Sequence, residues 1–382
     1  MNKTLEKIKS LARSTMNPPL VDAKKNGRRI MGYFCSYIPE EIIHAAGFIP
    51  YRIRAVGSEN TIRGDKYFSP LNCTFVRHCF DKVLHDDYAF LDGVVFLNGC
   101  DHTRRMYDNW RDVRQELAIG PEFLYMFVAP HVLTQNSLQQ YNKELDKFKK
   151  TLESTFQITV EEKNLTASIK LYNYKRILLK KLDQKRSRHP VAITGSELLN
   201  VMLAITAIPI EDAIALLETL DQLTEDRSVS QQGEVRLMLM GGCQEDLDHI
   251  DMIEKMGALF VADNLCLGAR HFHSEVDETE APLEALAKRY LYHLSCPRMI
   301  NGFSQRMEFI TKTLDDYNIE AVIAEKLKFC DLWGGEIFLL KKELKKNNIP
   351  ILAMERELFG GTSGQIKTRV QAFIEQVRGK RE

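Results

Sequence analysis

Residues 32–56, with the sequence GYFCSYIPEEIIHAAGFIPYRIRAV, contain the pattern that decides the fold. GYFCSYIP predicts a strand and the loop that leaves it, and FIPYRIRAV predicts a second strand. The segment between them predicts a helix, because Pro39 suits a first turn and Gly47 suits a C-cap. A strand, a helix and a strand in this order are typical of a parallel sheet with right-handed crossovers.

The same alternation continues along the chain and then starts again. In the first half, two more predicted strands flank a predicted helix: LDGVVFLN (91–98), DHTRRMYDNWRDVR (101–114) and EFLYMFVAP (122–130). The second half repeats strands and helices in turn: VRLMLMGG (235–242), DLDHIDMIEKMG (246–257), ALFVAD (258–263), EAVIAEKLKFCD (320–331), GGEIFLLKKELKKNN (334–348), IPILAMER (349–356) and GQIKTRVQAFIEQVR (364–378). The repetition predicts two similar halves.

We therefore predict an α/β protein with two doubly wound, Rossmann-like parallel-sheet domains. A chain of 382 residues is longer than one core usually supports, which also favours two domains. We place a helical arm at 1–27, the first α/β domain at 28–155, a charged helical connector at 156–195 and the second α/β domain at 196–382.

Composition and charge exclude several classes of partner. Lys and Arg number 52, as do Asp and Glu, so the formal net charge is zero and no overall positive field attracts nucleic acid or an anionic membrane. The N-terminal sequence has basic residues without an apolar core after them, and the most apolar stretch, 198–210, is too short to span a bilayer. We expect a cytoplasmic protein with no nucleic-acid and no membrane partner.

The chain has eight cysteines, and some of them stand where ligands bind. Cys100 and Cys330 each follow a predicted strand and each precede an aspartate, and ligands of parallel sheets bind outside the carboxyl ends of strands. Cys73 stands near the expected first turn of a helix, where the helix dipole favours a thiolate. If the two halves face each other, three thiolates in the cleft can hold a [4Fe–4S] cluster with one iron left open.

Spacing alone does not choose three cysteines from eight. There is no CxxC pair, so the compact zinc and ferredoxin signatures are absent. A free cysteine is most often a small buried hydrophobe, and Cys79 is expected in the core for that reason. The other four cysteines stay open between core and cleft: Cys35, Cys243, Cys266 and Cys296.

Several sequence blocks together resemble the 2-hydroxyacyl-CoA dehydratase and benzoyl-CoA reductase subunit family. The blocks are GYFCSYIPEEIIHAAGFIPYRIRA, LNCTFVRH, NGCDHTRRMYDNW, KFCDLWG and IPILAMERELFGGTSGQIKTRVQAFIE, and the resemblance covers about residues 28–380. The resemblance implies three cysteine ligands for one cluster in the matching blocks, namely Cys73, Cys100 and Cys330. It also implies two α/β domains with the iron–sulfur cluster in the cleft between them.

The resemblance further implies the activity and the partners. We expect a [4Fe–4S] subunit of a radical 2-hydroxyacyl-CoA dehydratase, which eliminates water from its acyl-CoA substrate through a ketyl radical. Its partners are then a related subunit, in a heterodimer or homodimer, and a separate ATP-dependent iron–sulfur activator protein. The alternatives are a benzoyl-CoA reductase-type subunit that reduces an aromatic ring, and a non-catalytic electron-relay subunit. A double-cubane reductase relative ranks lower, because Cys296 stands alone where further cysteines are expected.

Other residues near the blocks are candidates with plain structural alternatives. Ser36 and Glu41 are expected to contact substrate or the open iron, although Glu41 equally suits a helix cap. His102 is a candidate proton donor or hydrogen-bond donor to a cluster sulfur, although a helix-start histidine is often exposed. Arg104 and Arg105, on the helix that also holds Trp110, are candidates for CoA phosphates or the activator, with a solvated basic face favoured slightly.

Two further groups are open. Gln365 and Arg369 share a face of the last helix and are expected to brace the cluster loop or a neighbouring domain. Asp263, Cys266 and Arg270 line either the cleft or a strand-exit turn. The segment GGTSGQIKT lacks the Gly–Lys–Ser/Thr ending of a P-loop, so we do not expect this chain to bind ATP.

Overall fold

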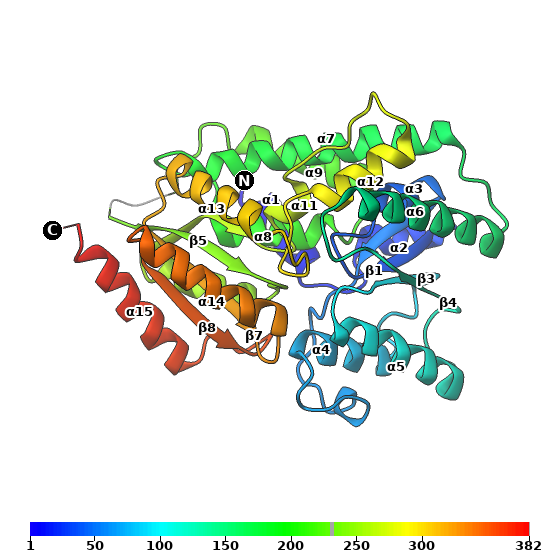
Figure 1. Ribbon diagram of the computed structural model, residues 1–382, viewed down its shortest axis with the longest axis horizontal. Coiled ribbons are helices and arrows are strands. Elements are labelled where there is room, and N and C mark those ends of the chain that lie inside the picture. Colours follow the sequence, from blue (N-terminus) through cyan, green and yellow to red (C-terminus); the bar gives the residue numbers. More distant parts are fainter. Residues whose placement is uncertain (230–232, 382) are drawn as a thin grey trace.

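The computed structural model describes residues 1–229 and 233–381, and its two four-stranded sheets are entirely parallel (Figure 1). The strands are β1 (Arg29–Tyr33), β2 (Phe48–Arg52), β3 (Gly93–Leu97), β4 (Phe123–Phe127), β5 (Val235–Gly241), β6 (Ala258–Asn264), β7 (Ala321–Leu327) and β8 (Ile351–Arg356). The first sheet has the order β2-β1-β3-β4 and the second has the order β6-β5-β7-β8. The identical order confirms the predicted α/β class with two similar halves.

The helices connect the strands and flank both sheets. Those up to the connector are α1 (Asn2–Ala12), α2 (Pro18–Lys25), α3 (Glu40–Ala45), α4 (Thr74–Leu84), α5 (Asp101–Leu117), α6 (Gln135–Phe156) and α7 (Glu162–Ser187), with a 3-10 turn at Gly64–Lys66. Those that follow are α8 (Gly195–Ile205), α9 (Ile210–Leu223), α10 (Leu247–Lys255), α11 (Ala269–Phe272), α12 (Pro282–Tyr292), α13 (Phe303–Asp316), α14 (Asp331–Lys346) and α15 (Gly364–Arg378).

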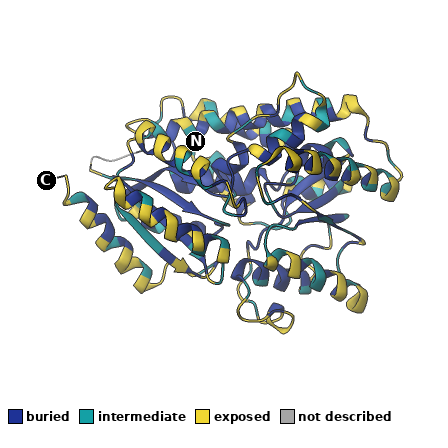
Figure 2. Ribbon diagram, viewed as in Figure 1, coloured by how far each residue is buried: buried dark blue, intermediate teal, exposed yellow. Residues whose placement is uncertain are grey.

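Each sheet is covered by helices on both faces, as a doubly wound fold requires. In the first sheet, Val95 and Leu97 pack with α3 and α6, whereas Val94 and Phe96 pack with α4 and α5 on the other face. Successive strand residues alternate between faces, so a strand buried on both faces is apolar throughout. Figure 2 shows most strands as buried, the edge strand β8 as partly exposed, and exposed residues on the outer sides of the helices.

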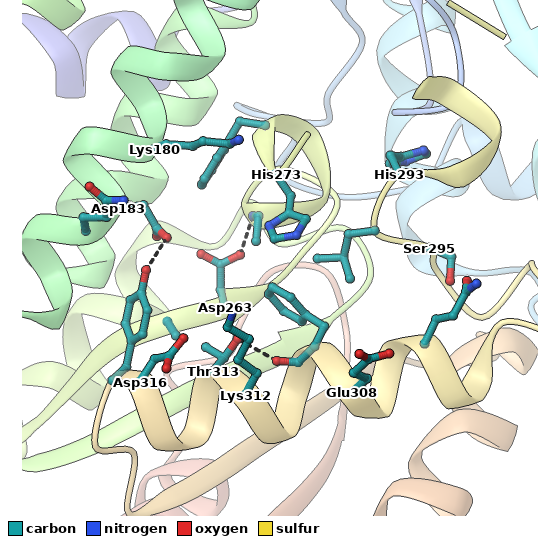
Figure 3. A pocket seen from close by; sticks show the side chains of 18 of the residues that line it. Lys180, Asp183, Asp263, His273, His293, Ser295, Glu308, Lys312, Thr313 and Asp316 are labelled. Carbon is teal, nitrogen blue, oxygen red and sulfur yellow. Dashed lines mark hydrogen bonds between the residues drawn. The ribbon is translucent and has the colours of Figure 1, made fainter. Parts of the chain in front are cut away.

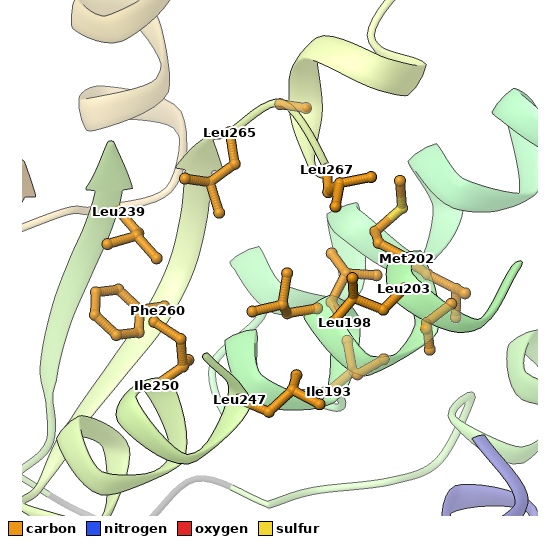
Figure 4. Close-up of a cluster of buried hydrophobic side chains, with 14 of the residues drawn as sticks. Ile193, Leu198, Met202, Leu203, Leu239, Leu247, Ile250, Phe260, Leu265 and Leu267 are labelled. Carbon is orange, nitrogen blue, oxygen red and sulfur yellow. The ribbon is translucent and has the colours of Figure 1, made fainter. Parts of the chain in front are cut away.

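The second sheet follows the same rule. Leu237 and Leu239 of β5 pack with α8, α10 and α15, and Met238 and Met240 face α13 and α14. Figure 4 shows part of the first of these clusters, with Leu198 and Met202 of α8 and Phe260 of β6 among its labelled side chains. The N-terminal helix α1 packs against α8 in the same cluster.

The two halves are in closer contact than the predicted division of the chain into an arm, a domain, a connector and a second domain suggests. The long helix α7 contacts α3 of the first half and α9, α11 and β6 of the second half (Figure 1). Helix α12, which lies within 196–382, packs against α6 of the first half. Residues of α12 therefore belong to the core of the first half, although they lie in the second half of the sequence. None of the helices in the described ranges combines the length and apolar character needed to cross a bilayer.

Candidate functional site

Three helices begin at the three cysteines expected to be ligands. Cys73, Cys100 and Cys330 are the N-cap residues of α4, α5 and α14. Cys100 follows β3 and Cys330 follows β7, the corresponding strand of the other sheet. The first-turn amides of a helix are unpaired and its N-terminus has partial positive charge. All three positions therefore favour a thiolate, or another anion bound at the helix N-terminus.

The three thiols line one cavity of about 360 Å³ between the halves. The wall also contains the first turns of α5 and α14, with Asp101 and Asp331 directly after their cysteines. Four further cysteines line the same cavity, so that seven of the eight do: Cys35, Cys73, Cys100, Cys243, Cys266, Cys296 and Cys330. Cys79 is fully buried in the first-half core and is not among them, as expected.

Burial controls the state of the free thiols. It raises the pKa of Cys73, and the neighbouring Cys330 and Cys100 raise it further, although the amides of Phe75 and Val76 act in the opposite direction. Burial likewise raises the pKa of Cys330 to about 11, against the amide of Trp333. These thiols are therefore protonated near neutral pH in the free chain, and metal binding must release their protons.

A second group of thiols lies at the ends of β5 and β6. The hydrogen bond from Cys243 and the Arg270 guanidinium, whose Nη2 lies 3.2 Å from Sγ of Cys266, hold the pKa of Cys266 well below its usual value. The shared hydrogen bond and burial raise the pKa of Cys243. Of these two sulfurs, Cys266 is therefore the one whose surroundings favour a thiolate.

The donor set of the cavity fits an iron–sulfur cluster. Thiolates are the ligands of such clusters, and here Cys100 and Cys330 follow corresponding strands of the two sheets while Cys73 begins α4. In the parts of the chain that the structure describes, no group of three or more His, Cys, Asp or Glu side chains is compact enough for a single metal ion. A cluster of several irons needs more widely separated sulfurs than one ion does.

His102 connects the cysteine segments across the cavity. Its Nε2 donates to the carbonyl oxygen of Phe329, at 3.0 Å, directly before Cys330. Its Nδ1 lies 3.4 Å from the backbone N of Cys73 and 3.1 Å from Oδ1 of Asn72. Both ring nitrogens are thus engaged with neighbouring groups of the chain, which favours a positioning role over that of proton donor.

The structure does not bring Ser36 or Glu41 into the cavity wall. Ser36 is buried beside Cys35 but does not line the cavity. Glu41 is fully buried in an ion pair with Arg176 of α7, and its Oε2 accepts from the Tyr290 hydroxyl at 2.7 Å. Although burial alone would raise it, the guanidinium holds the pKa of Glu41 below its usual value. The expected contact of Glu41 with the substrate is therefore replaced by a structural ion pair.

A second ion pair beside it, between Glu40 and Lys175 at 2.9 Å, includes a histidine that responds to pH. His271 Nε2 lies 3.3 Å from Glu40, yet burial lowers the pKa of His271 to about 4, helped by Lys175 and Arg289. The unfolded chain takes up this proton near pH 6.5, so stability is present above that pH and is lost as the pH falls toward 4.

We expect the free energy of unfolding to fall more steeply with acid in the wild type than in His271→Gln. Between pH 6.5 and pH 4.5 the extra loss should be about 2 kcal/mol, because the variant has no proton to gain at this position. Urea unfolding at four pH values measures both slopes. Parallel slopes would mean that the pKa of His271 is the same in the folded and the unfolded protein.

Other candidates lie away from the cavity or in its outer rim. Arg104 and Arg105 are exposed on α5, as a solvated basic face requires, whereas Trp110 is fully buried in the core and does not line the cavity.

Gln365 and Arg369 are exposed, and Arg369 donates to the Ala353 carbonyl oxygen of its own sheet. The prediction that these last two brace the cluster loop is therefore wrong.

Asp263 borders a different cavity. It accepts from the amides of Leu265 and Ala269 and pairs with Arg186, which is the strand-exit arrangement. The cavity beside it is larger, about 520 Å³, and lies between α7, α11 and α13 (Figure 3). Its wall has acidic and basic side chains but no cysteine.

Sequence reasoning left four cavity cysteines unassigned, although the repeat contained a signal for them. Cys35 and Cys243 each follow the first strand of a half. Cys73 and Cys296 each lie between the second and third strands, and Cys100 and Cys330 each follow the third. The six thus form three corresponding pairs, with Cys266 in addition.

Comparison with known proteins gives a consistent result. Residues 35–377 match the family model described as 2-hydroxyglutaryl-CoA dehydratase, D-component. The chain is 27% identical to YjiM of Escherichia coli, which is named provisionally as a dehydratase subunit, with 96% of each chain covered. It is 23% identical to a benzoyl-CoA reductase subunit of Thauera aromatica, over 92% of this chain and 91% of that one. It is 22% identical to the (R)-phenyllactyl-CoA dehydratase beta subunit of Clostridium sporogenes, with 92% of each covered.

Proposed function

The chain belongs to the 2-hydroxyglutaryl-CoA dehydratase D-component family, and from this premise we propose that it is the iron–sulfur subunit of an enzyme that acts on an acyl-CoA. The observation that carries the proposal is the position of Cys73, Cys100 and Cys330 at three helix N-termini around one cavity. When bound there by three thiolates, a [4Fe–4S] cluster supplies one-electron transfer and one open iron for a substrate oxygen.

The residues of the chain perform the supporting tasks. Three helix N-termini favour the negative charge of the ligand sulfurs. His102 fixes the spacing between the Cys73 and Cys330 segments through its two backbone hydrogen bonds. The apolar part of the wall, which includes Phe34, Phe75 and Leu327, limits the access of water to the sulfurs. The first choice of reaction is elimination of water from a 2-hydroxyacyl-CoA, and the alternative is reduction of an aromatic acyl-CoA ring.

A second candidate is favoured by the four further thiols of the cavity. A single [4Fe–4S] cluster uses at most four cysteines, but seven line this wall. The three corresponding pairs of the repeat support a larger centre with three thiolates from each half, as in a double-cubane reductase. The low rank given to this alternative from the sequence rested on the isolation of Cys296, which lines the cavity beside Cys35 and Cys266.

We also propose that the chain works in a complex. The relatives in Thauera aromatica and Clostridium sporogenes are each named as one part of a larger enzyme, which supports a related subunit as the partner of this chain. A separate ATP-dependent activator protein is proposed as the electron source, since no P-loop ending is present in this chain. In this arrangement a non-catalytic, electron-relay role is the alternative for the chain itself.

The test is turnover by the full chain, purified without oxygen and combined with its partner subunit, the activator, ATP and a reductant. Release of an enoyl-CoA from a 2-hydroxyacyl-CoA supports the dehydratase, and consumption of benzoyl-CoA with net use of reductant supports the reductase. Reduction of a small molecule without any CoA thioester supports the double-cubane candidate. An iron-loaded chain that binds no CoA thioester and reduces nothing alone, but is needed by its partner, is an electron relay.

A further inference from the structure

Three arginine side chains beside the cavity are buried without a carboxylate partner. Arg52, Arg270 and Arg298 are at most 2% exposed. Within residues 1–229 and 233–381, none of them forms an ion pair with a carboxylate. Four other buried arginines do so: Arg176 with Glu41, Arg186 with Asp263, Arg306 with Glu336 and Arg356 with Glu325. Arg54 and Arg289 are also buried without an ion pair in these ranges, but their guanidiniums donate to backbone carbonyls and neither residue lines the thiol cavity.

The three guanidiniums approach the cavity from separate elements. Arg52 is the last residue of β2 and lines the cavity, and its Nη1 is buried without a hydrogen-bond partner. Arg298 lines the cavity after Cys296 and donates to the carbonyl oxygens of Ala129 and Pro130. Arg270 donates to Cys266 from α11 and lies over the Trp333 ring. Neutral carbonyls and rings orient these cations but do not neutralise them.

A buried cation needs a nearby anion. Guanidinium keeps its proton in proteins, and a buried charge without a partner is strongly destabilising. The two carboxylates in the cavity wall do not neutralise these arginines. Asp101 is 95% exposed and pairs with Arg104, and Asp331 forms no ion pair with any of the three arginines. Cys266 Sγ accepts from Arg270, and even as a thiolate it would balance at most one of the three guanidiniums. An iron–sulfur centre bound by thiolates would supply the negative charge that is still needed.

We propose that Arg52, Arg270 and Arg298 are positioning residues that balance the negative charge of the cluster and hold its reduction potential at a less negative value. The inference rests on the proposed function, since it concerns the same cavity. The reduction potential of a cluster depends on net charge, on hydrogen bonds to sulfur and on solvent exposure. The three arginines act on the net charge, because they place positive charge around the cluster. Adding an electron to a buried anion is easier when fixed positive charges surround it.

The test compares Arg52→Met with Arg52→Lys and with Arg104→Met in the full, iron-loaded chain. Arg52→Met should shift the midpoint potential to a more negative value by at least the 59 mV that a tenfold change represents for one electron. Arg52→Lys keeps the charge and should stay near the wild type. Arg104→Met removes a side chain that is 63% exposed and screened by water, so its potential should not change. An unchanged potential in Arg52→Met with full iron content would overturn the proposal.

Thermal unfolding of the iron-free chain at pH 6 provides a second readout that needs no cluster. Without the cluster, Arg52 is a buried cation with no ion-pair partner among the described residues, so Arg52→Met should unfold at a higher temperature than the wild type. A side chain needed only for packing would give the opposite shift, and that result would overturn the proposal. A wild type that binds no iron contradicts the proposed function, whereas this comparison still decides whether Arg52 lacks its counter-charge.

Discussion

Replacing Cys100 with alanine is expected to remove most of the iron from the anaerobically purified chain. The same result is expected for Cys73→Ala and Cys330→Ala, because each change removes one of the three proposed ligands, whose side chains line one cavity. Two remaining thiolates hold a cluster poorly, and the binding free energy of a metal centre depends on every ligand. Iron and sulfide analysis with the visible absorption spectrum measures the loss.

Cys79→Ala is the matched control for these variants. Cys79 lies on α4, six residues after Cys73, but is fully buried in the first-half core and away from the cavity. Its loss should lower stability slightly and leave the iron content at the wild-type value. Iron retained in all three ligand variants, or lost only in Cys79→Ala, would refute the assignment of ligands.

Replacing Arg176 with methionine is expected to lower the free energy of unfolding by about 3–5 kcal/mol. The change leaves the Glu41 carboxylate buried without its ion-pair partner, with the Tyr290 hydroxyl as a remaining hydrogen-bond donor and the Arg289 guanidinium nearby. Removing one member of a buried ion pair is costly because the other charge stays in a low-dielectric environment. Guanidinium chloride unfolding of the iron-free chain gives the difference directly.

The double variant Glu41→Gln, Arg176→Met separates the ion pair from simple loss of packing. It removes both charges, so it should be more stable than Arg176→Met alone. Glu41→Gln by itself should keep its iron, since Glu41 is outside the cavity. A loss below about 1 kcal/mol in Arg176→Met would mean that the pair is not formed as described.

The sheets and the positions of Cys100 and Cys330 could be predicted from the sequence, because both depend on local patterns. Apolar runs give strands, and parallel strands end at one edge, so Cys100 and Cys330 were expected where the structure has them. The opening strand is shorter and earlier than its apolar letters suggest, ending at Tyr33. The residues after it, including Cys35, turn toward the cavity instead of continuing the strand.

The rest depends on packing between distant segments, which the sequence does not reveal. Glu41 has the spacing of a helix cap, but its partner Arg176 lies 135 residues away on the connector helix. Cys296 follows α12, and its place in the cavity depends on the packing of α12 against α6. Arg52 ends an ordinary apolar strand, and only the assembled cavity reveals that it has no counter-charge.

The iron and acid-labile sulfide content of the wild-type chain, purified and analysed without oxygen, tests the central claim most directly. We predict equal numbers of the two, at about four of each per chain for a single cluster on Cys73, Cys100 and Cys330. A count of about eight irons would favour the larger centre that the second group of thiols can hold. A colourless chain without iron after reconstitution with iron and sulfide would contradict the account.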